Sequence, residues 1–301
     1  MDYSRGQRID CEIQKVDKMN VVSLFNGMNT GRQALENIGI KVDKYYSSEI
    51  KPYAIELTQY HFPDTIQVGD VTKWREWDID WSKIDLILSG SPCQDLSAAG
   101  KRAGINGKKS SLFFTFVEIL NHSKSLNPNV LFLQENVGSA SKLDVGIMSR
   151  ALGVYPVRIN SSLVTAQLRD RYYWSNIRTI QTIFDVVTDI PQPKDRNIML
   201  QDIIENGYVD RQKSLCLLQG YWSKKPKETF EKMKYRYDLG MLQIIFIENQ
   251  KVRFLTKIEM CRLQGFPDNY CDILSTAKAA SLLGDGWTLP IIEHILSFIQ
   301  L

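Results

Sequence analysis

Short apolar runs alternate with longer mixed segments along the first half of the chain. Runs with the length and β-branched character of buried strands occur in NVVSLF, KYYSSE, DTIQVGD, KIDLILSG and NVLFLQEN. Helix-forming stretches lie between them, in RQALENIGI and at residues 53–60 and 111–123. Strands that alternate with helices pair in parallel, so the pattern predicts an α/β fold with a doubly wound, mostly parallel, Rossmann-like sheet. Ligands bind such sheets at the carboxyl ends of the strands.

The alternation fades after Trp174, where a segment with the sequence PQP and many lysines extends to about Val252. Regular patterning returns in RFLTKIEMCRLQGF and ends in PIIEHILSFI. We therefore predict an N-terminal tail at residues 1–18, a main domain at 19–178, a small inserted domain at 179–252, called the insert below, and a return to the main domain at 253–301.

Composition excludes several protein classes. The chain has 301 residues, of which 44% are hydrophobic and 24% charged, as in soluble globular proteins. No apolar run approaches the roughly 18 residues of a membrane span, and the polar start is unlike a signal peptide, so we expect an intracellular, cytoplasmic protein. Five cysteines without a CxxC pair, and three histidines, encode neither a disulfide framework nor a zinc site.

Three strand ends predict a nucleoside-like ligand. FNGMNTG, residues 25–31, follows the first strand and opens a helix, but lacks the GxGxxG spacing that NAD or FAD would require. Glu49 ends the next strand, where an acid can bind ribose hydroxyls, and Asp70 follows the third, where it can accept from an adenine amino group. Together they suit S-adenosylmethionine, although each alone could be an ordinary turn or a surface acid.

Candidate catalytic groups follow two later strands. In GSPCQDLS, Cys93 follows an apolar strand and a proline, which is the position of a nucleophile in a ligand crevice. NVLFLQENV places Glu135 and Asn136 at the end of another apolar strand, where a carboxylate has to be paired or protonated. QLRDRYYW places Arg169 and Arg171 two residues apart, on one face of a strand.

In this order, FNGMNTG, SSEI, GDV, GSPCQDLS, ENV, QLRDR, LTKIEMCRLQGFPDNY and GDGWTLP resemble the motifs of the DNA cytosine-5 methyltransferase family. The resemblance runs from about Asn20 to Leu301 outside the insert. SLFF, GFPDNY and GDGW look most like the de novo branch and its phage or bacterial relatives. The family implies a methyltransferase sheet with a target-recognition insert, and transfer of a methyl group from S-adenosylmethionine to carbon 5 of cytosine in double-stranded DNA.

The resemblance also implies roles for single residues. Cys93 would add to carbon 6 of a flipped-out base while Glu135 protonates ring nitrogen 3. Arg171 would hold the base carbonyl, Arg169 would support the covalent adduct, and Asn136 would order the surrounding loops. The cofactor contacts it implies are Phe25, Asn26, Gly27, Met28, Thr30, Glu49, Ile50, Asp70, Val71, Pro92, Leu112, Asp285, Gly286 and Trp287.

Two basic segments predict the DNA surface. Residues 96–112 carry a net +4 among glycines, and residues 211–237 carry a net +6 among aromatic side chains, so the remaining residues carry −7 within an overall +3. Basic groups interleaved with aromatics are typical of phosphate and base contacts, although solvated basic faces would look the same. The predicted DNA contacts are Ser97, Lys101, Arg102, Lys108, Lys109, Arg211, Lys213, Lys224, Lys225 and Arg236.

Several alternatives stay open. Asp285 occupies a position where the family usually has Asn, so we hypothesise that it tunes cofactor selection, even toward a modified S-adenosylmethionine. Because a relative in the family acts on tRNA, RNA is a rival substrate. A catalytically silent DNA-binding relative is another alternative, although Cys93, Glu135, Glu49 and Asp70 are all present. A restriction enzyme is a candidate partner.

Overall fold

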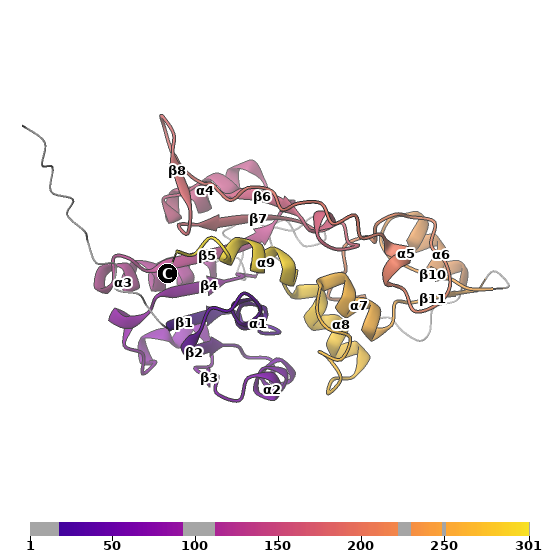
Figure 1. Ribbon diagram of the computed structural model, residues 1–301, viewed down its shortest axis with the longest axis horizontal. Helices are drawn as coiled ribbons and strands as arrows, with labels where there is room; N and C mark the ends of the chain where they lie inside the picture. The colour runs from indigo at the N-terminus through magenta and orange to yellow at the C-terminus, as the bar shows by residue number, and fades with distance from the viewer. Residues whose placement is uncertain (1–17, 93–111, 222–229, 249–250, 301) are drawn as a thin grey trace, which may run out of the picture.

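The computed structural model describes residues 18–92, 112–221, 230–248 and 251–300, and the predicted tail at 1–18 lies almost wholly outside them. Within these residues a seven-stranded sheet has the order β3-β2-β1-β4-β5-β7-β6 (Figure 1). Its strands are β1 (Met19–Leu24), β2 (Val42–Ser48), β3 (Ile66–Gln67), β4 (Leu86–Ser89), β5 (Leu131–Val137), β6 (Val157–Asn160) and β7 (Asp170–Ser175). Strands β1 to β5 pair in parallel, and β7 is antiparallel to both neighbours. The mostly parallel sheet confirms the predicted fold class.

Successive residues of the strands point into two separate cores, one on each face of the sheet. Val21 and Tyr45 lie in the first core, whereas their neighbours Val22 and Tyr46 lie in the second. The first core is covered by α1 (Thr30–Asn37), α2 (Pro52–His61) and α9 (Leu289–Leu296), and the second by α3 (Leu112–Leu126) and α4 (Lys142–Leu152). Burial on both faces explains why these strands read as continuous apolar runs.

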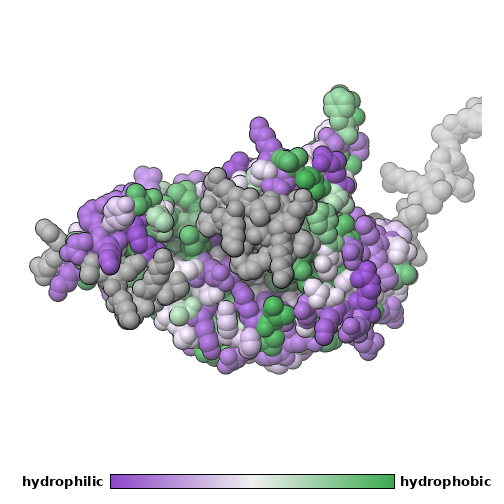
Figure 2. All heavy atoms as spheres, turned by 180° about the vertical axis from the view of Figure 1, so that it is seen from behind, coloured by the Kyte–Doolittle hydropathy of each residue, from purple (hydrophilic) through white to green (hydrophobic). Residues whose placement is uncertain are grey.

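The first residues of the predicted insert stay attached to the sheet. They form a hairpin of β8 (Thr179–Gln181) and β9 (Val186–Thr188), whose Thr188 hydroxyl bonds to the backbone of Ser175 in β7. The tip of the hairpin projects from the body and is apolar, with Ile183 91% and Phe184 89% exposed (Figure 2). The part of the insert that lies away from the sheet therefore begins after the hairpin.

The rest of the insert forms the far end of the molecule (Figure 1). It contains α5 (Leu200–Ile203), α6 (Phe230–Asp238), β10 (Ile245–Phe246) and β11, which extends to Arg253 (Val252–Arg253). Helices α7 (Lys257–Gln264) and α8 (Thr276–Asp285) lie between it and the sheet, and short 3₁₀ helices span Val71–Glu76, Trp81–Lys83 and Ser161–Leu163. Buried residues of the insert, such as Tyr221 and Tyr237, belong to the same core as α7 and α9, so apolar packing is continuous between the two ends.

Candidate active site

The ends of four parallel strands lie side by side where the strand order reverses. β1 pairs with β2 on one side and with β4 on the other, and β4 pairs with β5. In this register Leu24 lies opposite Ser48 and Ser89, and Ser89 lies opposite Gln134. The loops that follow these residues therefore open on one edge of the sheet, at the position where α/β folds bind ligands.

The loop after β1 has an unusual backbone. Phe25, Gly27 and Asn29 have φ angles of 56°, 57° and 62°, in the left-handed region, which is costly for the two residues with side chains. Glu49 stabilises this shape, because its carboxylate accepts from the backbone N–H of Gly27 at 2.8 Å and from those of Ile50 and Lys51 at 2.7 and 2.9 Å. The ends of β1 and β2 are thereby joined into one rigid wall.

This wall has the groups that an adenosine-like ligand needs. Glu49 retains part of its acceptor capacity beyond three backbone bonds, and one oxygen of Asp70 caps Thr72 at 2.9 Å while the other has no partner among the described residues. Ile50 is 70% exposed and offers an apolar surface beside Glu49. Both side-chain polar atoms of Asn29 are buried without a partner in the described part of the chain. The chemistry of these groups fits S-adenosylmethionine.

The other predicted cofactor residues near this loop differ in their burial and in their contacts within the protein. Asn26 donates to Thr58 and accepts from the hydroxyl of Tyr45, so its side chain is used within the protein. Met28, Thr30 and Val71 are buried, whereas Phe25, Pro92 and Leu112 are half-buried. A Cβ atom on Gly286 would lie 2.6 Å from the sulfur of Met28, which shows how closely the GDGW segment packs on this loop.

One carboxylate oxygen of Asp285 has two partners, Lys51 and Gln219. Its carboxylate lies 2.8 Å from the ammonium of Lys51 and accepts from the Nε2 of Gln219 in the insert at 2.8 Å. Burial alone would lower the pKa of Lys51, but the charge and hydrogen bond of Asp285, together with smaller contributions from Tyr53 and Glu49, outweigh this effect and the pKa is raised. Neither Lys51 nor Gln219 was predicted from the sequence, where they stand 234 and 66 residues from Asp285 without a distinctive motif.

Glu135 lies at the end of β5 between two partners. Its Oε1 is 2.8 Å from the Nε of Arg171, and its Oε2 accepts from the indole N–H of Trp287 at 3.1 Å. Only 9% of Glu135 is exposed, so these two contacts offset the cost of burying its charge. Trp287 also packs on Gly90, where a Cβ atom would lie 2.8 Å from the indole nitrogen. The structure thus brings the predicted acid, an arginine and the GDGW segment together.

Ser91, two residues before Cys93, is hydrogen-bonded to side chains of β5, the strand that carries Glu135. The hydroxyl of Ser91 accepts from the Nε2 of Gln134 at 2.9 Å and from the Nδ2 of Asn136 at 3.4 Å. Pro92 follows at the edge of the site. The predicted residues that lie outside the described residues are Cys93, Ser97, Lys101, Arg102, Lys108, Lys109, Lys224 and Lys225.

Arg169 and Arg171 have different surroundings. Arg169 precedes β7 by one residue, is 3% exposed, and donates to three carbonyl oxygens: Leu217 at 3.1 Å, Gly284 at 3.1 Å and Gly286 at 2.7 Å. Burial lowers the pKa of its guanidinium, and the nearby charge of Arg171 adds to this effect. Arg169 therefore joins segments of the protein, whereas Arg171 pairs with Glu135.

Cys216 was not among the predicted site residues, yet it lies beside both arginines. Its sulfur is 3.3 Å from Arg169. Burial alone would raise the pKa of this thiol, but the positive charges of Arg169 and Arg171 outweigh burial and the pKa is lowered. No local motif distinguishes Cys216, so only its position in the fold identifies it.

The predicted DNA-binding residues of the insert that the structure describes, Arg211, Lys213 and Arg236, are all half-buried. The ammonium of Lys213 donates to the carbonyls of Ser162, Thr165 and Ile198 at 2.7, 3.2 and 2.6 Å, which uses all three of its donors. Arg211 stacks on the ring of Tyr237 at 3.8 Å and donates to its carbonyl. Arg236 lies near the end of α6. The sequence did not separate these structural contacts from surface charge.

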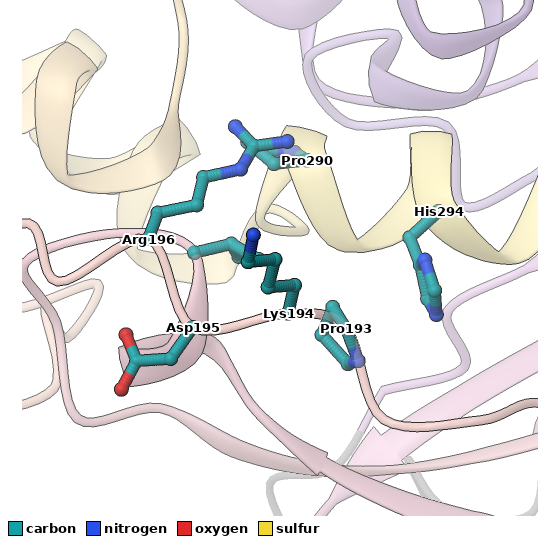
Figure 3. A pocket seen from close by; sticks show the side chains of 7 residues that line it. Pro193, Lys194, Asp195, Arg196, Pro290 and His294 are labelled. Carbon is teal, nitrogen blue, oxygen red and sulfur yellow. The ribbon is translucent and has the colours of Figure 1, made fainter.

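A surface hollow of about 490 Å³ lies between residues 193–196 and α9 (Figure 3). It is lined by Val164, Pro193, Lys194, Asp195, Arg196, Pro290 and His294. None of the predicted catalytic or cofactor residues lines it. In the described part of the chain, no group of His, Cys, Asp and Glu side chains could hold a metal ion, and no helix is long and apolar enough to cross a membrane.

Comparisons with known proteins agree with this geometry. Residues 19–152 and 168–300 match the family model of C-5 cytosine-specific DNA methylases. The chain is 27% identical over 316 residues to the type II methyltransferase M1.ScrFI of Lactococcus lactis subsp. cremoris, over 94% of this chain and 78% of that protein. It is 34% identical over 176 residues to the orphan methyltransferase M.SPRI of Bacillus phage SPR, over 54% and 38% of the two chains. A solved DNMT2 of Spodoptera frugiperda has the same fold, with a TM-score of 0.62 at 19% identity over 94% of this chain and 99% of that one.

Proposed function

The chain belongs to the family of C-5 cytosine-specific DNA methylases, and we propose that Cys93 is the nucleophile of its reaction. The enzyme transfers a methyl group from S-adenosylmethionine to carbon 5 of cytosine in DNA. One observation carries our assignment of the site. Glu135 is held by Arg171 and Trp287 at the end of β5, next to the strand β4 that continues into Pro92 and Cys93.

Carbon 5 of cytosine is a weak nucleophile, so the ring has to become electron-rich first. We propose that the Cys93 thiolate forms a bond to carbon 6 while ring nitrogen 3 takes a proton that Glu135 holds when the base is bound. Arg171 and Trp287 orient Glu135 from its two sides. After carbon 5 has taken the methyl group, water takes the proton from carbon 5, and the electron pair of that bond expels the Cys93 thiolate from carbon 6. Ring nitrogen 3 returns its proton to Glu135, which restores the aromatic ring and releases 5-methylcytosine.

The bound cofactor supplies an electrophilic methyl group. In our proposal the oxygens of Glu49 accept from the ribose hydroxyls, and the second oxygen of Asp70 accepts from the adenine amino group. Ile50 covers the adenine ring with its exposed apolar side chain. The bonds from Glu49 to the backbone keep this wall in shape before the cofactor arrives, which reduces the entropy lost on binding.

We propose that the DNA substrate is double-stranded, with the target base flipped out of the helix. Support comes from the basic and aromatic segment at residues 211–237, in which Tyr235 is 65% exposed. Contacts from Ser97, Lys101, Arg102, Lys108 and Lys109 stay predictions. Because relatives are type II and phage methyltransferases, we also propose a bacterial or phage-infected cytoplasm and a restriction enzyme as partner.

Trapping on 5-fluorocytosine tests the nucleophile, because the fluorine replaces the proton whose loss releases the enzyme. Duplex DNA, single-stranded DNA and RNA containing this base are incubated with the protein and S-adenosylmethionine, and covalent complexes are resolved on denaturing gels. We expect an adduct on duplex DNA that Cys93→Ser abolishes and the control Cys11→Ser retains. An adduct that persists in Cys93→Ser, or none with the wild type, contradicts the assignment, and an adduct confined to RNA contradicts the duplex substrate.

Target context requires a different measurement. Bisulfite sequencing of DNA from cells that express the protein would report which cytosines carry the methyl group and which bases flank them. The same experiment with Cys93→Ser provides the background.

A further inference from the structure

Residues 216–219 of the insert lie directly against residues 284–286, the GDGW segment predicted to contact the cofactor. Arg169 bonds to both, because it donates to the carbonyl of Leu217 on one side and to those of Gly284 and Gly286 on the other. This guanidinium is buried, so its bonds are shielded from competing water. Arg169 thus fixes the distance between the two segments.

The two segments also meet without Arg169. A Cβ atom on Gly284 would collide with the backbone of Leu218 and Gln219, so glycine is needed for the backbones to approach this closely. Beside it, Gln219 donates to Asp285, which also pairs with Lys51 at the start of α2. The contact therefore combines close packing, a buried arginine and a hydrogen bond to a charged carboxylate.

One side of this contact adjoins the region predicted to bind the cofactor, and the other side belongs to the region that we propose binds DNA. Gly286 packs on Met28 in the cofactor loop, and Trp287 donates to the catalytic acid Glu135. On the other side, residues 216–219 are part of the basic segment at 211–237 that faces DNA in our proposal. Arg169 and Asp285 link residues 216–219 to residues 284–286. A ligand that fixes one of these two segments should therefore restrict the other.

We propose that residues 216–219 couple the two binding events, with Gln219 and Arg169 as positioning residues, so that bound cofactor strengthens DNA binding and bound DNA strengthens cofactor binding. This inference rests on the proposed DNA contact of the insert. Thermodynamic linkage requires the same coupling factor in both directions. Gln219 was not among the predicted site residues, and its contact with Asp285 assigns it this role.

The coupling factor is measured at equilibrium with S-adenosylhomocysteine, so no methyl transfer is needed. Fluorescence anisotropy gives the DNA affinity of a duplex carrying the bisulfite-defined target with and without this cofactor product. Calorimetry gives the affinity for S-adenosylhomocysteine with and without the duplex. The two ratios should agree, which is an internal check on the measurement.

We expect wild type to show a coupling factor well above 1, and Gln219→Ala to reduce it roughly three- to tenfold, toward 1, the range of one ordinary hydrogen bond between partly solvated groups. Gln219 is exposed, so the variant should fold normally. The matched control is Gln192→Ala, another exposed glutamine whose Nε2 donates to a carbonyl, that of Arg158, away from this contact. It should keep the wild-type factor.

Two results would overturn the proposal: a wild-type factor of 1, or an unchanged factor in both Gln219→Ala and Arg169→Lys. Either result leaves covalent trapping on 5-fluorocytosine unaffected, so a failure of coupling is distinguishable from a failure of the proposed chemistry. If the wild type binds S-adenosylhomocysteine but no duplex DNA, the proposed substrate fails first, and the coupling fails with it.

Discussion

The carboxyl edge of the sheet and the insert both carry charged side chains, but they use them differently. At the edge, acids and bases pair with one another: Glu135 with Arg171, and Asp285 with Lys51. In the insert, Lys213 donates to three backbone carbonyls and acts as internal structure. A count of basic residues therefore overstates the charge available to DNA, whereas the charged residues at the strand ends lie together at one edge of the sheet.

Arg169 and Arg171 show the same difference within one short segment. Both side chains reach Cys216, as expected for residues two apart on one face of a strand, although β7 begins at Asp170 and Arg169 lies just outside it. Its side chain joins the insert to the GDGW segment, while that of Arg171 reaches Glu135. Four experiments can sharpen or break this division between chemistry and structure.

The largest effect is expected for Glu135→Gln. The amide keeps the shape of the side chain but cannot deliver a proton, so the methylation rate should fall roughly 10²- to 10⁴-fold. Single-turnover assays measure this at a temperature where the variant is folded, because loss of the charge weakens the buried pair with Arg171 and should lower the melting temperature. DNA affinity should change little. Glu118→Gln, which alters an exposed pair with Arg75, is the control. Retention of more than about a tenth of the rate would remove Glu135 from the role of acid.

Arg169→Ala is expected to act on stability. Its loss removes the guanidinium donors from three carbonyls and leaves a cavity in a buried place, so the free energy of unfolding should decrease by about 3 kcal/mol. Urea denaturation measures this. Arg171→Ala, compared in parallel, should reduce the methylation rate more than Arg169→Ala does at a temperature where both are folded. The opposite pattern would reverse the roles assigned to the two arginines.

Charge removal separates lysines that contact DNA from lysines that bond within the protein. If Lys224 and Lys225 contact phosphates, changing both to Ala should reduce the slope of log affinity against log salt by about 2. Lys213→Met should leave the slope unchanged and instead lower the free energy of unfolding by about 1–3 kcal/mol, since its bonds are internal. A slope that falls with Lys213→Met would restore this residue to the DNA surface.

The smallest effect is expected for Asp285→Asn, at the boundary of the two regions. Lys51 and Asp285 are 34% and 40% exposed, so solvent screens their attraction. Loss of the pair should change affinity for S-adenosylmethionine about two- to fivefold, less at high salt. Calorimetry and mass spectrometry of the product measure this. Unchanged affinity and product would end the hypothesis that Asp285 tunes cofactor selection.

The sequence predicted the parts of the site that depend on local order. Val21 and Val22, or Tyr45 and Tyr46, alternate between two cores because strand side chains alternate in direction, and this made the apolar runs readable as buried strands. Polar residues that end such runs, like Glu49 and Glu135, then had to lie at one edge of a parallel sheet. The groups that bond to Glu49 and Glu135 could not be predicted from such local patterns.

What the sequence determined by itself was the five parallel strands, the helices α1, α2 and α3 and the doubly wound class, because each follows from a periodicity of two to four residues. Tertiary structure alone decided that Trp287 bonds to Glu135 across 152 residues and that Asp285 joins Lys51 across 234. It also decided that Lys213 lies inside and that Cys216 lies beside two arginines. Such contacts depend on how whole elements pack, and local periodicity contains no information about them.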